Sequence, residues 1–320
     1  MKTKQLVAFV VAAAVFLVTG VCSVLVNTWS NKTASESMSM YESLMGGGAE
    51  VTPLEEYIAV VEVEGTIAGE PTTSMWGEAE GYSHPRTMDY IDQLMYDEKN
   101  KGIMLYMNTP GGEVTASDDM YLKLMEYKKE TGRKIYCYFA DQSCSGGYYI
   151  SMAADEIYAN RNCWTGSIGV IISTVNMQGL YEKLGIKEVN ITSGRNKAMG
   201  SAGEEMTTEQ NAILQSLVDE AYDQFVSIIV EGRGLSESKV RELADGRIYS
   251  AKQALEHDLI DGICTKDEYF DKVLAEAGEN VVLFEREMED YSFESLFGTI
   301  EELQPKSDAE VLGEIGRAHV

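Results

Sequence analysis

Lys134-Ile-Tyr-Cys-Tyr-Phe139 runs into Asp141-Gln-Ser-Cys-Ser-Gly-Gly147, then into an apolar stretch from Tyr148 to Ala154 and into Glu156-Ile-Tyr-Ala159. The first and last segments are rich in β-branched and aromatic residues, which favour strands. A glycine-containing turn and an apolar stretch separate them. Strands joined in this way predict an α/β fold with a mainly parallel sheet.

The alternation of strands and helices extends to both sides of this stretch. Apolar runs predict strands at 57–64 and 103–107. Helical spacing of apolar residues predicts helices at 88–95 with Thr87 as the N-cap, around 120–125 and ending near Gly132, at 206–231 with Thr207 and Gln210 as a capping box, at 236–243 and at 251–257. In parallel sheets the functional loops follow the carboxyl ends of strands, where both Gly-Gly turns occur.

The composition limits the possible functions. The chain has 320 residues, 52 acidic against 26 basic side chains, and a net charge of −26, so we expect no nucleic-acid partner. Only three histidines are present: His84 in a Ser-His-Pro turn, His257 late in an amphipathic stretch, and His319 beside the C-terminus. A histidine-dependent catalytic triad therefore has poor candidates.

The longest apolar run is Leu6 to Val26, preceded by Lys2 and Lys4. At ~1.5 Å per residue such a helix covers roughly 30 Å, enough to span a bilayer. We therefore expect residues 6–26 to anchor the chain in the cell membrane, with residues 1–5 cytoplasmic and the rest extracytoplasmic. A cleavable signal peptide and a lipoprotein modified at Cys22 are the alternatives.

The flanking segments differ in composition from the centre of the chain. Residues 27–53 contain Ser, Met, Gly and Thr and predict a flexible stalk, whereas 276–313 predict an acidic C-terminal tail. Residues 314–320 match the translation of a common sequencing adapter and are expected to be artefactual.

The cysteines show no zinc-binding spacing, so we expect no metal and no cofactor. Cys137, Cys144 and Cys163 lie in apolar or tightly turned surroundings and are expected to be buried thiols.

Ser145 follows a strand and precedes two glycines, an arrangement that suits an acyl-transfer nucleophile. Glycines leave the backbone N–H groups open to a substrate carbonyl, and Gly111-Gly112 offer a second source of such donors. Because histidines are scarce, a lysine is the remaining candidate base, and lowering its pKa from ~10.4 to ~7.5 needs about 4 kcal/mol. Lys197 is a candidate because it lies among small residues without an adjacent acid.

Five motifs in order resemble signal peptide peptidase A, a family of membrane-anchored serine proteases. They are Asn108-Thr-Pro-Gly-Gly-Glu-Val114, Ser145-Gly-Gly-Tyr-Tyr-Ile150, Thr165-Gly-Ser-Ile-Gly-Val170, Ser193-Gly-Arg-Asn-Lys197 and Gly246-Arg-Ile-Tyr-Ser-Ala-Lys-Gln-Ala254. The resemblance implies a protease domain at 54–275, with a crotonase-like and Clp-protease-like fold of repeated ββα units. It also implies a homo-oligomeric ring whose subunits complete each other's active sites.

The resemblance assigns roles to five residues. Ser145 is implied to be the nucleophile, Lys197 the general base, and Ser167 the residue that orients the lysine. Gly112 and Gly146 are implied to donate to the oxyanion. The implied substrates are cleaved signal peptides and other apolar peptides.

Two positions depart from the family pattern: Ala198 stands where an acidic residue is common, and Cys144 where alanine is common. We expect Ala198 to alter pH dependence or positioning rather than to abolish activity. Cys144 is an alternative nucleophile, but only position 145 matches the motif. The alternative functions are an inactive, membrane-bound peptide-binding scaffold and, on the same fold, a crotonase-type acyl-CoA enzyme.

Overall fold

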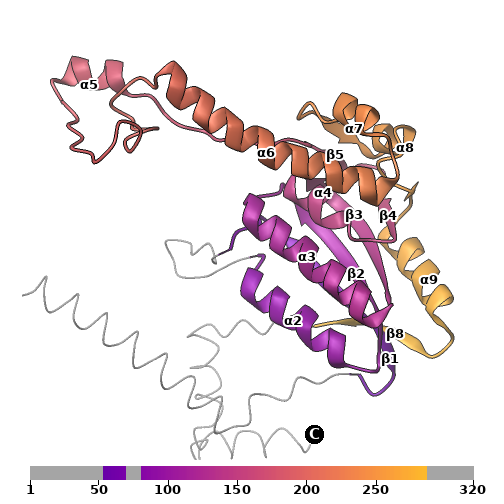
Figure 1. Ribbon diagram of the computed structural model, residues 1–320. Coiled ribbons are helices and arrows are strands. Elements are labelled where there is room, and N and C mark those ends of the chain that lie inside the picture. Colours follow the sequence, from indigo (N-terminus) through magenta and orange to yellow (C-terminus); the bar gives the residue numbers. More distant parts are fainter. Residues whose placement is uncertain (1–52, 70–80, 287–320) are drawn as a thin grey trace, which may run out of the picture. The chain divides into compact units, whose positions relative to one another are not determined.

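The computed structural model describes residues 53–69 and 81–286 (Figure 1). Within these ranges the strands form one eight-stranded sheet in the order β6-β5-β3-β2-β1-β8, with β4 beside β3 and β7 beside β4. Neighbouring strands are parallel except β5 and β6. The strands are β1 Glu56–Glu64, β2 Asn100–Thr109, β3 Lys134–Cys144, β4 Glu156–Ala159, β5 Trp164–Gly166, β6 Ile248–Ser250, β7 Gly262–Ile263 and β8 Val281–Glu285.

Helices pack on both faces of the sheet. The larger hydrophobic core contains buried residues of α2, α3, α4, α6, α7 and α8, and the smaller core lies under α9. The described helices are α2 His84–Tyr96, α3 Val114–Thr131, α4 Gly146–Ser151, α5 Gln178–Leu184, α6 Thr208–Arg233, α7 Glu237–Leu243, α8 Ala251–Glu256 and α9 Lys266–Ala277. The predicted α/β architecture with a mainly parallel sheet is confirmed.

The start of α6 agrees with the sequence, whereas the start of α2 does not. Thr207 and Gln210 form both hydrogen bonds of the predicted capping box. The prediction of Thr87 as the N-cap of α2 is wrong, because the helix begins at His84 with Ser83 at the N-cap position. Pro85 fits the first turn, where its missing N–H breaks no helical hydrogen bond. Thr87 instead donates its hydroxyl to the Ser83 carbonyl at 2.9 Å.

Strand β3 is longer than predicted. It ends at Cys144, so Ser145 directly follows its carboxyl end. Its residues 136–139 pair with β4, and its residues 142–144 pair with β5 at the same edge. On its other side, Ser143 is in register with Thr109 at the end of β2. The turns that follow β2 and β3 therefore meet at one carboxyl edge of the sheet.

The sheet continues past residue 275, where the sequence placed the end of the main domain. Strand β8 pairs in parallel with β1, so the beginning of the predicted acidic tail belongs to α9 and β8. The predicted anchor at 6–26 and the terminal segment 314–320 lie outside the described residues, as does nearly all of the predicted stalk. Within the part that is described, no helix combines the length and apolar character needed to cross a bilayer.

Residues 169–224, which we call the arm, contain no buried side chain. The arm comprises α5, the segment after it and the N-terminal part of α6. Figure 1 shows α5 at the end of α6 that lies away from the sheet. Its exposed large aliphatic residues include Ile171 at 83%, Val189 at 69% and Ile191 at 97% exposure. Several exposed large aliphatic side chains in one segment favour an interaction site there.

Candidate active site

Ser145 lies between β3 and α4 in a backbone conformation that non-glycine residues rarely adopt. Its φ is 50° and its ψ is −115°. Such a conformation costs about 1–3 kcal/mol and persists only where the surroundings enforce it. Here the Ser145 N–H donates to the Gly166 carbonyl at 2.8 Å, and the Ser145 carbonyl accepts from the Tyr149 N–H at 2.9 Å. The half-buried serine is thereby fixed at the start of a helix.

Gly111 makes room for this serine. Its φ is +98°, and a Cβ on it would lie 2.8 Å from both the Ser145 Cβ and the Gly146 nitrogen. Its N–H donates to the Thr109 hydroxyl at 3.0 Å, which fixes the turn. Gly111 was predicted only as part of the Gly111-Gly112 pair. That pair was the available signal, because two consecutive glycines allow close backbone approach on both sides.

The N–H groups of Gly112 and Gly146 come from the two neighbouring turns. A methyl group on Gly146 would lie 3.3 Å from the Gly112 nitrogen, so these two residues are close together. In the described residues neither N–H donates a hydrogen bond to another protein atom. Two adjacent unpaired donors next to a serine are the geometry that stabilises an oxyanion.

Ser117 was missed by the sequence analysis. It is 2% exposed and lies so close to Gly146 that a Cβ there would overlap its Oγ. Its hydroxyl donates to the Glu113 carbonyl at 2.8 Å, which directs the hydroxyl hydrogen away from Gly146. Ser117 therefore limits position 146 to glycine.

Ser167 lies beside the turn that contains Ser145, the predicted nucleophile; we call residues 144–147 the nucleophile turn. Its φ is 49°, and its N–H donates to the Arg247 carbonyl at 2.7 Å. The preceding residue, Gly166, accepts the hydrogen bond from the Ser145 N–H. The predicted Ser145 and Ser167 are therefore linked through one residue, and both have positive φ.

Lys197 is not placed beside Ser145 in the single chain. It is exposed and belongs to the segment of the arm between α5 and α6, which lies away from the sheet (Figure 1). Ser145, in contrast, directly precedes α4, which packs against the sheet. The structure thus brings together four of the five predicted site residues, Ser145, Ser167, Gly112 and Gly146, but leaves Lys197 apart from them.

The side-chain hydroxyl and amine groups of this candidate site have no partners in the described part of the chain. The Ser145 and Ser167 hydroxyls make no hydrogen bond there, and the Lys197 ammonium makes no hydrogen bond or ion pair. The two histidines in the described ranges, His84 and His257, have other neighbours. The His84 Nδ1 lies 2.6 Å from the Tyr82 hydroxyl, and the His257 ring packs against Tyr249.

Cys144 has the properties of a packed thiol rather than of a nucleophile. It is 6% exposed, and its Sγ lies 3.6 Å from the Trp164 carbonyl. Burial raises the pKa of the Cys144 thiol to about 11, so the reactive thiolate is scarce near neutral pH. Cys137, Cys144 and Cys163 are buried and free, as predicted. Among the described residues no cluster of His, Cys, Asp or Glu could hold a metal.

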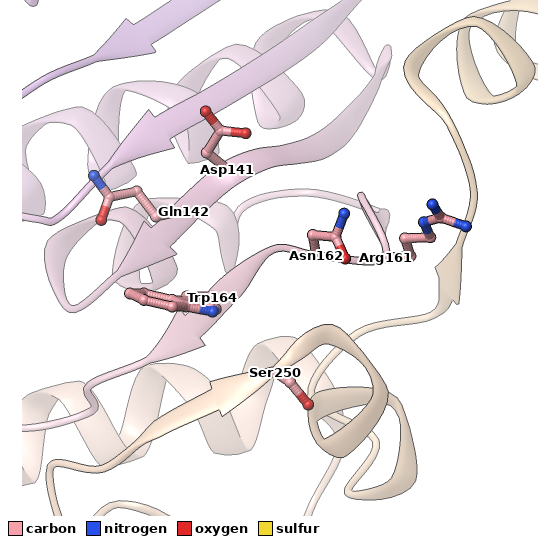
Figure 2. A pocket seen from close by; sticks show the side chains of 6 residues that line it. All are labelled: Asp141, Gln142, Arg161, Asn162, Trp164 and Ser250. Carbon is pink, nitrogen blue, oxygen red and sulfur yellow. The ribbon is translucent and has the colours of Figure 1, made fainter.

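An open pocket of about 620 Å³ lies beside the C-terminal part of β3 and the first residue of β5 (Figure 2). Gln142 and Trp164 line it and are in register on these two strands. Each lies three residues before a predicted site residue, Gln142 before Ser145 and Trp164 before Ser167. The Trp164 residue is 61% exposed. The remaining lining residues are Asp141, Arg161, Asn162 and Ser250. The pocket therefore combines one large aromatic surface with polar groups.

Comparison with known proteins identifies the class of protein to which the chain belongs. Residues 127–280 match Peptidase family S49. The chain is 32% identical over 283 residues to an Enterococcus faecium protein provisionally named signal peptide peptidase SppA, covering 86% of this chain and 82% of that protein. It is 30% identical over 217 residues to Protease 4 of Haemophilus influenzae, covering 67% of this chain and 34% of that protein.

A third relative is the chloroplastic serine protease SPPA of Arabidopsis thaliana, 30% identical over 179 residues that cover 55% of this chain and 26% of that protein. The family match and these relatives define a serine peptidase, and the α/β fold with Ser145 at the end of β3 agrees with that class. More particularly, the chain belongs to the SppA family within peptidase family S49.

Proposed function

We propose that the protein is a membrane-anchored serine endopeptidase that hydrolyses cleaved signal peptides and other apolar peptides. The observation that carries the proposal is the strained Ser145 next to the unpaired N–H groups of Gly112 and Gly146. This geometry suits attack on an amide carbonyl. The substrate class is supported by the family and by the exposed aromatic surface of Trp164 in the adjacent pocket.

In the proposed mechanism, the neutral Lys197 amine takes the proton of the Ser145 hydroxyl while Ser145 Oγ bonds to the substrate carbonyl carbon. The Gly112 and Gly146 N–H groups stabilise the resulting oxyanion. The C–N bond then breaks, and the leaving amine takes the proton from Lys197. Water attacks the acyl-enzyme with Lys197 as its base, and the proton returns to Ser145 Oγ. Ser167 orients the lysine throughout.

We further propose that the lysine comes from a neighbouring copy of the chain in a homo-oligomeric ring. A lysine acts as a base near neutral pH only when it is desolvated, and Lys197 is exposed in the single chain. The exposed aliphatic residues of the arm supply a surface that another subunit could bury. Ser167 lies beside Ser145, which supports its proposed role as the residue that orients the incoming lysine.

The proposed location follows from the predicted helix at residues 6–26. It would hold the N-terminus in the cytoplasm and the catalytic domain outside, with membrane lipid as its partner. No cofactor enters the proposed reaction. Peptides released into the membrane by preprotein processing would then reach the enzyme in the same bilayer.

The test uses full-length protein in detergent with a signal-peptide substrate. Ser145→Ala and Lys197→Ala should each lower kcat by about 10⁴-fold while the thermal midpoint and oligomeric state stay unchanged. A fluorophosphonate probe should label the unmodified protein but not Ser145→Ala. Full turnover in either variant would contradict the dyad. Labelling without turnover of apolar peptides would contradict the proposed substrate.

A further inference from the structure

Three side chains from three helices form a closed hydrogen-bonded triangle where α6 leaves the core. The Tyr149 hydroxyl on α4 donates to Asp118 Oδ1 on α3 at 2.5 Å. Gln224 Nε2 on α6 donates to Asp118 Oδ1 at 3.0 Å and to the Tyr149 hydroxyl oxygen at 2.7 Å. One glutamine amide therefore joins α6 to both other helices.

The α4 side of this triangle is firmly held. Tyr149 is 4% exposed, and its ring packs against Phe225 and Tyr121 with centroid distances of 5.0 and 5.7 Å. Burial and the hydrogen bond to Asp118 raise the pKa of the Tyr149 hydroxyl, which therefore stays protonated and able to donate. The Tyr149 N–H also donates to the Ser145 carbonyl. Tyr149 thus connects the triangle to the nucleophile turn.

Gln224 lies at a point of α6 where a small change in the direction of the helix displaces the whole arm. It immediately precedes Phe225, the first buried residue after the arm. From Thr208 to Gln224, α6 extends roughly 24 Å at ~1.5 Å per residue. A tilt of about 5° at Gln224 would move the far end by about 2 Å, more than catalytic geometry tolerates.

Other contacts hold α6 from its opposite side. The Tyr222 hydroxyl donates to the Ala244 carbonyl at 3.0 Å, and Asp223 pairs with Arg241 at 2.8 Å. These contacts join α6 to α7 and its C-terminal end. Among the described residues, Gln224 supplies the polar side-chain link from α6 to α4, the helix that directly follows Ser145.

We propose that Gln224 is a positioning residue, which sets the direction of the arm relative to α4 and so delivers Lys197 to the serine of a neighbouring subunit. The inference rests on the proposed shared active site. Asp118 and Tyr149 are the fixed acceptors of this link. Gln224 acts through the arm and does not touch the substrate.

The first test compares single variants of the full-length protein in detergent. Gln224→Ala should lower kcat about tenfold, because misplacing a catalytic group by an ångström or more is costly. The oligomeric state and thermal midpoint should not change. Asp118→Ala should show the same loss of kcat. Asp118→Asn keeps an acceptor oxygen and should therefore retain most of the activity of the unmodified protein. The matched control is Ser227→Ala, whose hydroxyl bonds only within α6.

The second test mixes subunits by co-expression with two affinity tags. Gln224→Ala with Ser145→Ala should regain activity, because roughly one site in four pairs an intact serine with a correctly directed lysine. Gln224→Ala with Lys197→Ala should gain nothing, because every remaining lysine lies on a misdirected arm. Ser145→Ala with Lys197→Ala should regain activity and tests the shared site itself.

Each result decides a separate point. Full activity of Gln224→Ala, or recovery with Lys197→Ala instead of Ser145→Ala, would overturn the positioning role of Gln224 while leaving the proposed function intact. No recovery in the Ser145→Ala and Lys197→Ala mixture would contradict the shared site, and this inference with it. Recovery in the predicted pairs alone supports both.

Discussion

The nucleophile turn and the arm differ in how much of their structure one chain determines. Around Ser145, backbone hydrogen bonds and the packing of Gly111, Gly146 and Ser117 leave little freedom. The arm has no buried side chain, and its aliphatic residues face solvent. One half of the candidate site is therefore complete within the chain, whereas the segment with Lys197 lacks the packing that would fix a catalytic group. The two halves should therefore respond differently to substitution.

The largest expected effect is in the nucleophile turn. Gly146→Ala would place a methyl group over the Ser117 hydroxyl and next to the Gly112 nitrogen. We expect kcat to fall about 10²–10³-fold, as when an oxyanion donor is lost. Adding Ser117→Gly should recover part of the loss. The control is Gly179→Ala in the arm, which has open space around its Cα. Unchanged kcat in folded Gly146→Ala would contradict the predicted rigidity.

The next effect concerns the arm. Ile171→Ser and Ile191→Ser remove aliphatic side chains that are 83% and 97% exposed. If another subunit buries them, each change should weaken association about tenfold, from roughly 1.4 kcal/mol of lost apolar burial. Sedimentation in detergent measures this. Tyr96→Ser on α2, at 86% exposure, is the control and should leave association unchanged. If all three variants associated with equal affinity, the exposed aliphatic residues of the arm would have no special role in association.

A smaller effect is expected at the pocket. Trp164→Ala removes an aromatic surface that is 61% exposed, so folding should be little affected. We expect KM for an apolar peptide to rise about fivefold through lost contact with the ring, with kcat nearly constant. A polar peptide of equal length provides the comparison. Equal changes for both peptides would exclude a role of Trp164 in selecting apolar substrates.

The smallest effect concerns the anchored end of α6. Asp261 accepts from both Arg233 Nη atoms, at 2.9 and 2.8 Å, and from the Ile157 N–H at 2.7 Å. Burial opposes ionisation of Asp261, but the Arg233 and backbone hydrogen bonds together lower its pKa below the usual 3.8. A lowered folded-state pKa adds stability above about pH 4, and that stability is lost as the pH falls through the folded-state pKa.

Asp261→Asn should therefore reduce the unfolding free energy by about 1 kcal/mol at pH 7, a modest value because Asp261 is partly exposed. Urea unfolding between pH 7 and pH 3 measures this. The difference from the unmodified protein should shrink at the acidic end. A difference that grows on acidification would have the wrong sign for this ion pair.

Local sequence signals predicted the fold where they agreed with the packing. The β-branched and aromatic run at 134–139 is strand β3, and Thr207 with Gln210 caps α6. Strand β8 was missed because Val281–Glu285 is a short apolar run among acidic residues, and only its pairing with β1 defines it. The start of α2 was misplaced because Ser83 and Thr87 are both acceptable caps by residue type, and tertiary packing decides between them.

The site was predictable as far as it depends on neighbouring strand ends. Two Gly-Gly turns after successive strands predicted that Gly112 and Gly146 would lie near Ser145, and the register of β2 and β3 brings them together. Ser117 escaped notice because nothing in the local sequence shows that a residue of α3 limits position 146. The place of Lys197 relative to a serine could not be read from one sequence, since the arm makes no contacts that bury it.

Because the arm of a single chain has no buried side chain, the activity per chain would depend on the concentration of the enzyme. On the proposed mechanism, a newly made chain already carries its strained serine but has no desolvated base, so it is latent. Turnover then rises faster than linearly with surface density until the subunits are fully associated. Dilution would switch the peptidase off reversibly without unfolding it, and isolated chains could not digest their surroundings before they assemble.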